Sequence, residues 1–464
     1  MAVKLVSRDK AEKPVAIGRI IRIVPRSRNI EGLLLAFALG LNAFEIAQIQ
    51  LSTIAVLRAD FFIYWLPLAL LAIAFHVVLR MRAREADPIL LPIGVILNGL
   101  GLAEIYRLDL ATIASHGTNL FAGKQVVWTV VALLAAIATV VFVRTHLFLQ
   151  RYIYISMVIA IVLLLAPLTP FLGQTINGAR LWIGLFGFTF QPGELAKIAL
   201  TVFFAGYLVS RRDSLNLVGR KVFGMVIPRA RELGPIVVIW AASLGVLVLQ
   251  RDLGTSLLYF GLFVVMIYVA TGRPIYVLAG VGMFVTGALI ASRLMDYVAG
   301  RVAAWLNPFD PKYYDAIGGS YQLAQGNFGL AHGGLLGTGL GGGLPQLVPL
   351  AESDFIISSL GEELGMAGLF AILLLYLLMV SRGIRVAFNH TDDFSKLLAT
   401  GLSFVVALQL FIVIGGVSRV VPLTGLTTPL LAAGGSSLLA NWIIIGLLLR
   451  ISDSAGGSAR AVRL

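Results

Sequence analysis

Apolar runs of membrane-spanning length recur along this chain and constrain its fold more than any other feature. A helix needs about 20 apolar residues to cross the hydrocarbon core of a bilayer. Twelve runs approach that length, at residues 32–52, 62–79, 88–106, 125–143, 152–168, 194–209, 233–249, 254–271, 274–292, 364–381, 397–416 and 432–449. Because 58% of the 464 residues are hydrophobic and only 13% are charged, we expect an all-α polytopic membrane protein with about twelve transmembrane helices. A membrane β-barrel would instead alternate polar and apolar residues in short segments.

The distribution of basic residues predicts the orientation of these spans, since cytoplasmic loops are enriched in Lys and Arg. With both termini in the cytoplasm, 26 of the 36 Lys and Arg lie in cytoplasmic segments, nine in outer segments, and Lys197 within a span. The net charge of +13 therefore indicates basic cytoplasmic loops and not nucleic-acid binding. Residues 1–28 hold eight Lys or Arg and no uninterrupted apolar core, so we expect a cytoplasmic tail and not a cleavable signal.

One long polar stretch, residues 301–365, interrupts the apolar pattern on the predicted outer side. It carries the carboxylates Asp310, Asp315, Glu352, Asp354, Glu362 and Glu363. If the segment ESDFIISSLGEELG is helical, Asp354, Ser358 and Glu362 share a face and can line a polar cavity. Alternatively, Ser353 or Asp354 only caps the helix. The residues alone leave both interpretations open.

Two further outer segments place ionisable side chains at the start of predicted spans. Glu194 and Lys197 are three residues apart after Pro192, so they would share a helix face. They form either an internal ion pair or a functional site, because charges within membrane spans are costly. Asp252 precedes the segment LGTS, where it either caps a helix or acts in a site.

The Cys and His content of the chain limits the kinds of metal site that it can form. The chain has no cysteine, and its five histidines, His76, His116, His146, His332 and His390, show no metal-ligand spacing. Any metal would therefore be held by oxygen ligands. The segment GGLLGTGLGGG lacks the pattern of a phosphate-binding P-loop and is interpreted as a flexible loop.

Five motifs in order resemble the SEDS family, the RodA, FtsW and SpoVE proteins of bacterial cell-wall synthesis. They are GARLWIGLFGFTFQPGELAK, LQRDLGTSLL, GGSYQLAQGNFGLAHGGLLGTGLG, ESDFIISSLGEELGMAGL and PLLAAGGSSLLANW. The resemblance implies a ten-helix core over residues 88–450, with a long extracytoplasmic loop at 293–363. Residues 29–87 would then be two additional N-terminal transmembrane helices, and residues 451–464 a short cytoplasmic tail.

The same resemblance implies an activity. Family members polymerise lipid II on the outer face of the cytoplasmic membrane and release undecaprenyl pyrophosphate, with a class B penicillin-binding protein as the crosslinking partner. An inverting peptidoglycan glycosyltransferase is therefore expected, and the short C-terminal tail favours the RodA side of the family over FtsW. A lipid II flippase or other transporter, and a scaffold for a penicillin-binding protein, are the alternatives.

The resemblance also assigns residues. Asp354 matches the family's essential outer-loop aspartate, as general base or as ligand of a divalent cation, Mg²⁺ or Mn²⁺. Glu194, Lys197, Arg180, Trp182 and Asp252 fall on other motif positions and, with Glu362, are the candidate substrate-binding residues, Arg180 and Lys197 facing the leaving diphosphate. Departures from the family pattern occur at Gly193, Arg251, Glu352 and residues 432–436. None of them removes the presumed catalytic carboxylate.

Overall fold

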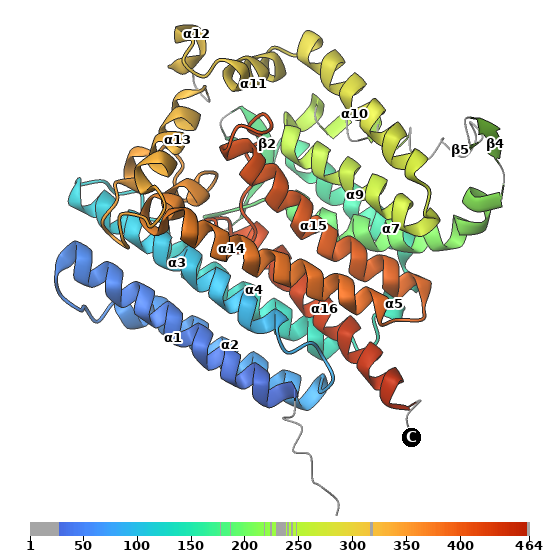
Figure 1. The fold of residues 1–464 in the computed structure, drawn as a ribbon, viewed down its shortest axis with the longest axis horizontal. Helices are drawn as coiled ribbons and strands as arrows, with labels where there is room; N and C mark the ends of the chain where they lie inside the picture. Colours follow the sequence, from blue (N-terminus) through green and yellow to red (C-terminus); the bar gives the residue numbers. More distant parts are fainter. Residues whose placement is uncertain are drawn as a thin grey trace, which may run out of the picture.

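The computed structural model is an all-α membrane protein. It describes residues 27–461 except 177, 186, 218, 223–224, 229–237, 239–240, 243–244, 247 and 316–318. Within these residues, ten helices are long and apolar enough to span a bilayer: α1 (Ser27–Ile54), α2 (Phe61–Arg82), α3 (Leu90–Ala114), α4 (Ala122–Phe142), α7 (Pro192–Leu217), α9 (Leu253–Thr271), α10 (Pro274–Leu294), α14 (Ile356–Phe388), α15 (Asp393–Val417) and α16 (Gly435–Ala461). They run roughly side by side (Figure 1). The predicted all-α polytopic fold class is confirmed, whereas the cytoplasmic placement of the termini stays a prediction.

Two of the twelve predicted spans are not among these ten helices. The run at 152–168 forms the shorter helix α6 (Ile153–Leu165), which continues as a 3₁₀ turn, η1 (Ala166–Leu168). The run at 233–249 lies mostly outside the described residues. The count of twelve therefore remains a prediction.

Burial within the bundle differs strongly between helices. α3 is buried almost all round, whereas α10 and the second half of α14 expose most of their apolar surface. Exposed apolar side chains on helices of this length are the expected surface toward lipid tails. The N-terminal helices α1 and α2 pack against α3 and α4, so they cover the central helix on one side. Polar side chains on α3 are thereby kept away from lipid.

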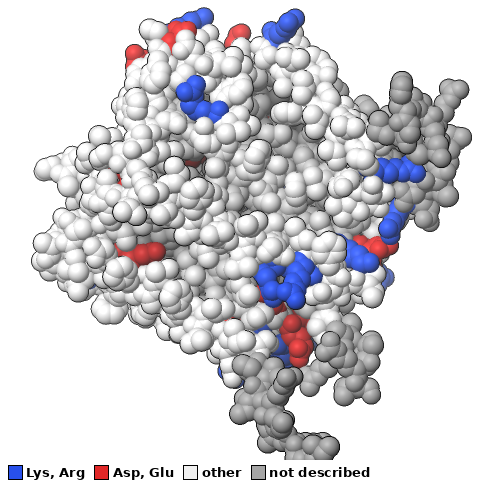
Figure 2. Space-filling view, in the orientation of Figure 1, with Lys and Arg blue, Asp and Glu red and all other residues white. Residues whose placement is uncertain are grey.

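The long polar stretch and the residues just before it contain several short helices that the sequence did not indicate. These are α11 (Asp296–Leu306), α12 (Pro311–Tyr314), α13 (Tyr321–Gly333) and the 3₁₀ turn η2 (Pro345–Leu347). In Figure 1 these elements lie at the end of the bundle opposite the C-terminus. Figure 2 shows charged side chains mainly toward these two ends, with a broad, mostly uncharged belt between them. This distribution matches a protein that crosses a bilayer along the helix axes.

Helix α13 packs closely on the start of α14 because its contact face consists of glycines. A Cβ added to Gly326, Gly329 or Gly333 would lie 2.5 Å from Phe355, 3.2 Å from the Glu362 carboxylate and 2.1 Å from the Gly361 carbonyl oxygen, respectively. Small residues at this spacing allow two helix backbones to approach. The segment is therefore fixed against the bundle.

Short strands supplement the helices outside the spans. β1 (Gly173–Ile176), β2 (Ala179–Leu185) and β3 (Phe188–Phe190) form an antiparallel sheet in that order, with Gln174 opposite Trp182 and Ile183 opposite Phe190. β4 (Gly219–Val222) and β5 (Met225–Pro228) form a separate hairpin. A short helix, α5 (Leu147–Arg151), connects α4 to α6.

Candidate active site

Asp354 does not lie on a helix, so the predicted helical face of Asp354, Ser358 and Glu362 is wrong. α14 begins at Ile356, and residues 351–355 form a turn in front of it. Ser358 is fully buried against Gly326 of α13. Because Asp354 precedes the first helical residue, helical spacing does not determine where its side chain points. It therefore need not share a face with Ser358 and Glu362.

The partners of Asp354 come from α11 and from the segment that joins α15 to α16. Arg301 of α11 donates a hydrogen bond from Nη1 to the Leu423 carbonyl oxygen at 2.6 Å. A Cβ built on Gly425 would lie 3.6 Å from Asp354 Oδ2 and 4.0 Å from Arg301 Nη2. The carboxylate and the guanidinium therefore flank the same glycine. Gly425 has φ +78°, a conformation that glycine adopts without strain.

The electrostatic surroundings make Asp354 easy to protonate. Burial of the carboxyl group raises the pKa of Asp354 to about 6. Arg301 and the Ser353 side chain lower this pKa, while Glu352 and Asp252 raise it. An ionisable group with a pKa near neutrality and a nearby cation is the arrangement expected of a general base.

Asp252 caps α9, as one interpretation of the sequence predicted. Its carboxylate accepts a hydrogen bond from Thr255 N at 2.9 Å and another from the Thr255 hydroxyl. Burial raises the pKa of Asp252, with Thr255 and Arg301 opposing the shift and Glu194 adding to it. Arg301 thus influences both Asp252 and Asp354. From the sequence, Arg301 was only one of the outer basic residues, and its position beside the two carboxylates was not predicted.

Glu194 and Lys197 form the predicted ion pair, 2.5 Å between Lys197 Nζ and Glu194 Oε2. Lys197 is only 1% exposed, and Nζ also donates to Gln409 Oε1 of α15 at 2.8 Å. Gln409 donates in turn to the Thr427 carbonyl oxygen at 2.9 Å. Lys197 is therefore used inside the bundle, where it supports the segment that carries Gly425. In the sequence, the signal for this contact is Gln409, a polar residue within the apolar run 397–416.

Arg180 and Trp182 lie on β2, outside this group of contacts. Arg180 is exposed, and its Nε donates to the Thr175 hydroxyl at 3.3 Å. The strand β3 leads to Gln191, whose N–H donates to the Ser436 hydroxyl at 2.7 Å at the start of α16. The sheet is thus attached at the end of the bundle where α7 and α16 begin. The binding roles of Arg180 and Trp182 remain predictions.

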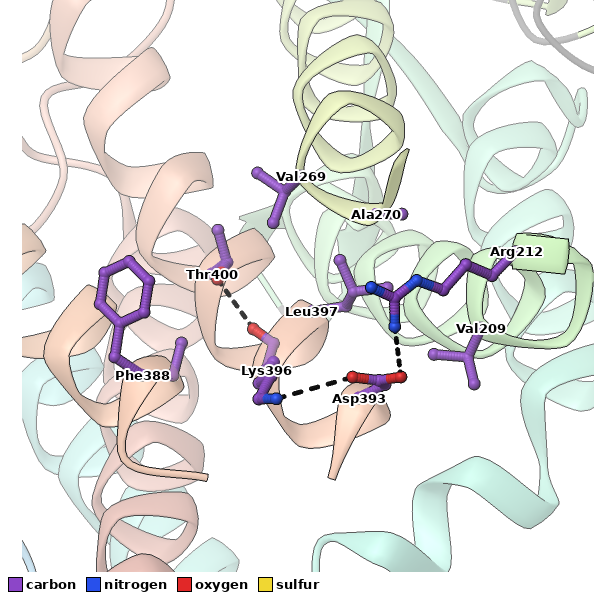
Figure 3. A pocket seen from close by; sticks show the side chains of 10 residues that line it. Val209, Arg212, Val269, Ala270, Phe388, Asp393, Lys396, Leu397 and Thr400 are labelled. Atoms are coloured by element: carbon purple, nitrogen blue, oxygen red, sulfur yellow. Dashed lines mark hydrogen bonds and ion pairs between the residues drawn. The ribbon is translucent and has the colours of Figure 1, made fainter. Parts of the chain in front are cut away.

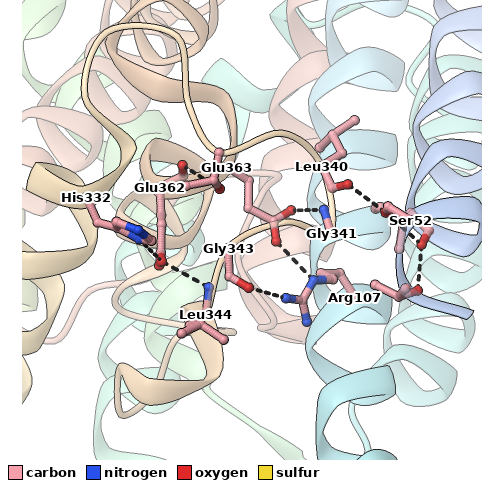
Figure 4. Close-up of polar contacts among 12 residues, drawn as sticks. Ser52, Arg107, His332, Leu340, Gly341, Gly343, Leu344, Glu362 and Glu363 are labelled. Carbon is pink, nitrogen blue, oxygen red and sulfur yellow. Dashed lines mark hydrogen bonds and ion pairs between the residues drawn. The ribbon is translucent and has the colours of Figure 1, made fainter.

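Glu362 and Glu363 hold the glycine-rich segment 334–344 (Figure 4). Glu362 Oε1 accepts from Leu344 N at 2.9 Å and lies 2.8 Å from His332 Nδ1. Glu363 Oε2 accepts from Gly341 N at 2.7 Å, and its Oε1 accepts from Arg107 Nε at 2.9 Å. The flexible loop predicted from the glycines is therefore held by carboxylates, and Glu362 shares no contact with Asp354.

An apolar cavity of about 280 Å³ adjoins the site. Its lining includes Leu253, Val302 and Thr424, the chain neighbours of Asp252, Arg301 and Gly425. It extends between α9, α10 and α15 to the exposed side chains Phe284 and Phe411. The cavity therefore extends from lipid-facing aromatic side chains to the chain neighbours of the polar group around Asp354.

The described residues offer no preformed metal centre, since no group of three or more His, Asp or Glu side chains within them is arranged to hold an ion. Asp354 can supply one carboxylate ligand. Mg²⁺ commonly takes one or two carboxylates together with substrate phosphates and waters. A single carboxylate is thus compatible with Mg²⁺ only where phosphates and waters complete the coordination.

Comparisons with known proteins agree with the fold and with the order of the motifs. The family model for FtsW, RodA and SpoVE, described as cell cycle proteins, matches residues 88–456. "Peptidoglycan glycosyltransferase RodA" of Mycobacterium tuberculosis is 43% identical over 449 residues, covering 96% of this chain and 94% of the relative. "Probable peptidoglycan glycosyltransferase FtsW" of Geobacter metallireducens is 32% identical over 377 residues, covering 80% and 96%.

Solved structures share the fold. The Thermus thermophilus rod shape determining protein RodA superposes with a TM-score of 0.56 at 24% identity, covering 79% of this chain and 96% of that one. A chain of a peptidoglycan synthase complex, in a study of coordinated polymerization and crosslinking, gives 0.63 at 24% identity, covering 80% and 98%. Helices α1 and α2 precede the residues that the family model matches. The alignment with the Mycobacterium tuberculosis relative covers 96% of this chain, so it includes both helices.

Proposed function

The chain belongs to the family of FtsW, RodA and SpoVE proteins, and on that premise we propose that it is a RodA-type peptidoglycan glycosyltransferase of the bacterial cytoplasmic membrane. It polymerises lipid II into glycan strands and releases undecaprenyl pyrophosphate. The observation that carries this proposal is the placement of Asp354: a carboxyl group with a pKa of about 6 beside Arg301, where an apolar cavity reaches the end of the bundle.

Asp354 acts as the general base. It accepts the proton of the acceptor sugar's 4-hydroxyl group while that oxygen bonds to the anomeric carbon of the donor. The bond from that carbon to the diphosphate oxygen breaks, and its electron pair leaves with undecaprenyl pyrophosphate. A single displacement of this kind inverts the α linkage of the donor to the β linkage of the glycan.

Arg301 is better placed than Lys197 to stabilise the leaving diphosphate. Arg301 is partly exposed beside Asp354, whereas Lys197 is buried and already bound to Glu194 and Gln409. A guanidinium binds phosphate oxygens through paired hydrogen bonds. Asp354 could contribute one carboxylate to a bound Mg²⁺ or Mn²⁺, which would supply further positive charge for the diphosphate.

The reaction takes place on the outer face. The start of α1 and the end of α16 lie at the end opposite α11–α13 (Figure 1), and most Lys and Arg fall in segments assigned to that inner end. Asp354 then faces outward. A class B penicillin-binding protein crosslinks the product. The synthase complex with the same fold gives a precedent for coupling polymerization to crosslinking.

The decisive experiment incubates purified protein with labelled lipid II and resolves the products on a gel. Wild-type protein is expected to form glycan strands, and Asp354→Asn to lose about 10² to 10⁴ of the rate, the usual contribution of a positioned general base. Asp315→Asn is the matched control, because Asp315 is an exposed carboxylate of the same outer stretch. Near-normal synthesis by Asp354→Asn overturns the assignment, and no synthesis by wild type favours a transporter or scaffold.

A further inference from the structure

A second cavity lies at the opposite end of the bundle, far from the proposed reaction. It has a volume of about 200 Å³ and opens between α7, α9, α14 and α15 (Figure 3). One wall is apolar and includes Val269, Phe388 and Leu397. Phe388 is 82% exposed at the end of α14, so this wall continues onto an exposed apolar surface of the kind that marks membrane or partner contacts.

Among the described residues that line this cavity, two are cations and one is a carboxylate. Arg212 Nη1 lies 2.5 Å from Asp393 Oδ2, and Lys396 Nζ lies 3.7 Å from Asp393 Oδ1. The Arg212 and Lys396 side chains are 46% and 42% exposed, respectively. A single carboxylate thus satisfies two cations only in part, and these three side chains together carry a net positive charge.

We propose that this cavity binds the phosphate headgroup of an anionic phospholipid between Arg212 and Lys396, with an acyl chain along the wall formed by Val269, Phe388 and Leu397. Charge complementarity identifies the headgroup, since basic pockets between transmembrane helices at a membrane surface suit anionic lipid phosphates. The apolar wall distinguishes a lipid from a free phosphate ion. The site is independent of the glycosyltransferase proposal, because none of its residues contacts the group around Asp354.

Substitution of Asp393 tests the proposal because it should change lipid binding in the opposite direction from removal of a cation. The Asp393 carboxylate occupies the two cations and repels a phosphate, so Asp393→Asn is expected to strengthen binding. Removal of either cation is expected to weaken binding about fivefold, the usual effect of one Lys or Arg near an anionic membrane surface. Asp392, and not Asp393, is the N-cap of α15, accepting from Ser395 N at 2.8 Å, so the helix start survives this substitution.

Native mass spectrometry of the full-length protein, titrated with phosphatidylglycerol in detergent, measures this binding. Arg212→Gln and Lys396→Gln are each expected to weaken it about fivefold and Asp393→Asn to strengthen it, with phosphatidylcholine binding weakly throughout. Arg84→Gln is the matched control, since Arg84 is exposed in the connection between α2 and α3 at the same end. Inorganic phosphate at millimolar concentration is expected not to displace the lipid.

Several results would overturn the proposal. Equal binding of phosphatidylcholine would show that negative charge on the headgroup is not recognised. Displacement by inorganic phosphate would show that the site binds phosphate and not a lipid. An equal loss in Arg84→Gln shows that general surface charge is responsible. If Arg212→Gln or Lys396→Gln lowers the unfolding temperature in detergent, Asp393→Asn decides alone, and unchanged or weaker binding in that variant rejects the site.

Discussion

Replacing Arg301 with glutamine should move the pH dependence of catalysis, because Arg301 lowers the pKa of the proposed base against the effect of burial. Catalysis requires the Asp354 carboxylate, so the rate of wild-type protein is expected to fall as the pH drops through about 6, the pKa of Asp354. Arg301 lowers this pKa by stabilising the carboxylate. Arg301→Gln removes the positive charge, so the pKa rises and activity is lost at a higher pH.

The size of the shift follows from the distance between the two charges. Asp354 Oδ2 and Arg301 Nη2 lie 3.6 and 4.0 Å from one point, the Cβ built on Gly425, so at most about 7.6 Å separates them. At about 7 Å, two unit charges interact by roughly 0.6 kcal/mol in water and about 2.4 kcal/mol at an effective dielectric constant of 20. Because both side chains are partly exposed, we expect the lower part of this range, or about 0.5 to 1 pKa unit.

The assay is the initial rate of lipid II polymerisation between pH 5 and 8.5, fitted for the midpoint of the acid limb. Arg301→Gln is expected to raise this midpoint and Glu352→Gln to lower it, since Glu352 raises the pKa of Asp354. Lys312→Gln is the control for a lost positive charge, because Lys312 is exposed on α12. An unmoved midpoint in Arg301→Gln would refute this reasoning, whatever happens to the maximal rate, which also depends on diphosphate binding.

Three further predictions concern stability and the metal. Lys197→Met should lower the unfolding temperature in detergent, because an unpaired buried Glu194 costs about 3 to 5 kcal/mol; the double variant Glu194→Gln/Lys197→Met should recover part of the loss. Gly425→Ala should cost about 1 to 2 kcal/mol through its positive φ, whereas Gly40→Ala in α1, where a Cβ meets no atom within 4 Å, should cost nothing measurable. Chelation with EDTA should stop polymerisation, with recovery on adding Mg²⁺ or Mn²⁺, and full activity in EDTA would contradict the proposed cation.

The sequence predicted what depends on local periodicity and composition. The length of the apolar runs predicted the spans, and the cap at Asp252 and the Glu194–Lys197 pair followed from spacing along one helix. It missed what depends on packing between distant segments. Arg301 and Gly425 reach Asp354 only when α11 and the segment before α16 are folded over the same end, and nothing near Asp354 in the chain indicates either residue.

The helix start shows a second limit of sequence reasoning. A shift of α14 by two residues removed Asp354 from the face of Ser358 and Glu362, and only contacts with α13 and the segment 334–344 reveal this register. Helix boundaries are the least certain part of a pattern because capping and packing compete there. Site geometry inferred from helical spacing at the first turn is correspondingly fragile.

The structure itself separates Asp354 from the other five carboxylates of the outer stretch. Glu362 and Glu363 accept hydrogen bonds from the segment 334–344, and Asp310 caps α12 by accepting from Lys312 N at 3.0 Å. Asp315 is exposed to solvent and accepts no such backbone contact from the segment 334–344. Glu352 is raised in pKa by burial and by Asp109, a residue of α3, so its surroundings differ from those of Asp354. Asp354 alone among the six combines partial burial, a cation beside it and an apolar cavity next to that cation. A base at this position can therefore take up a proton near neutral pH. It can also be reached by a lipid-linked sugar.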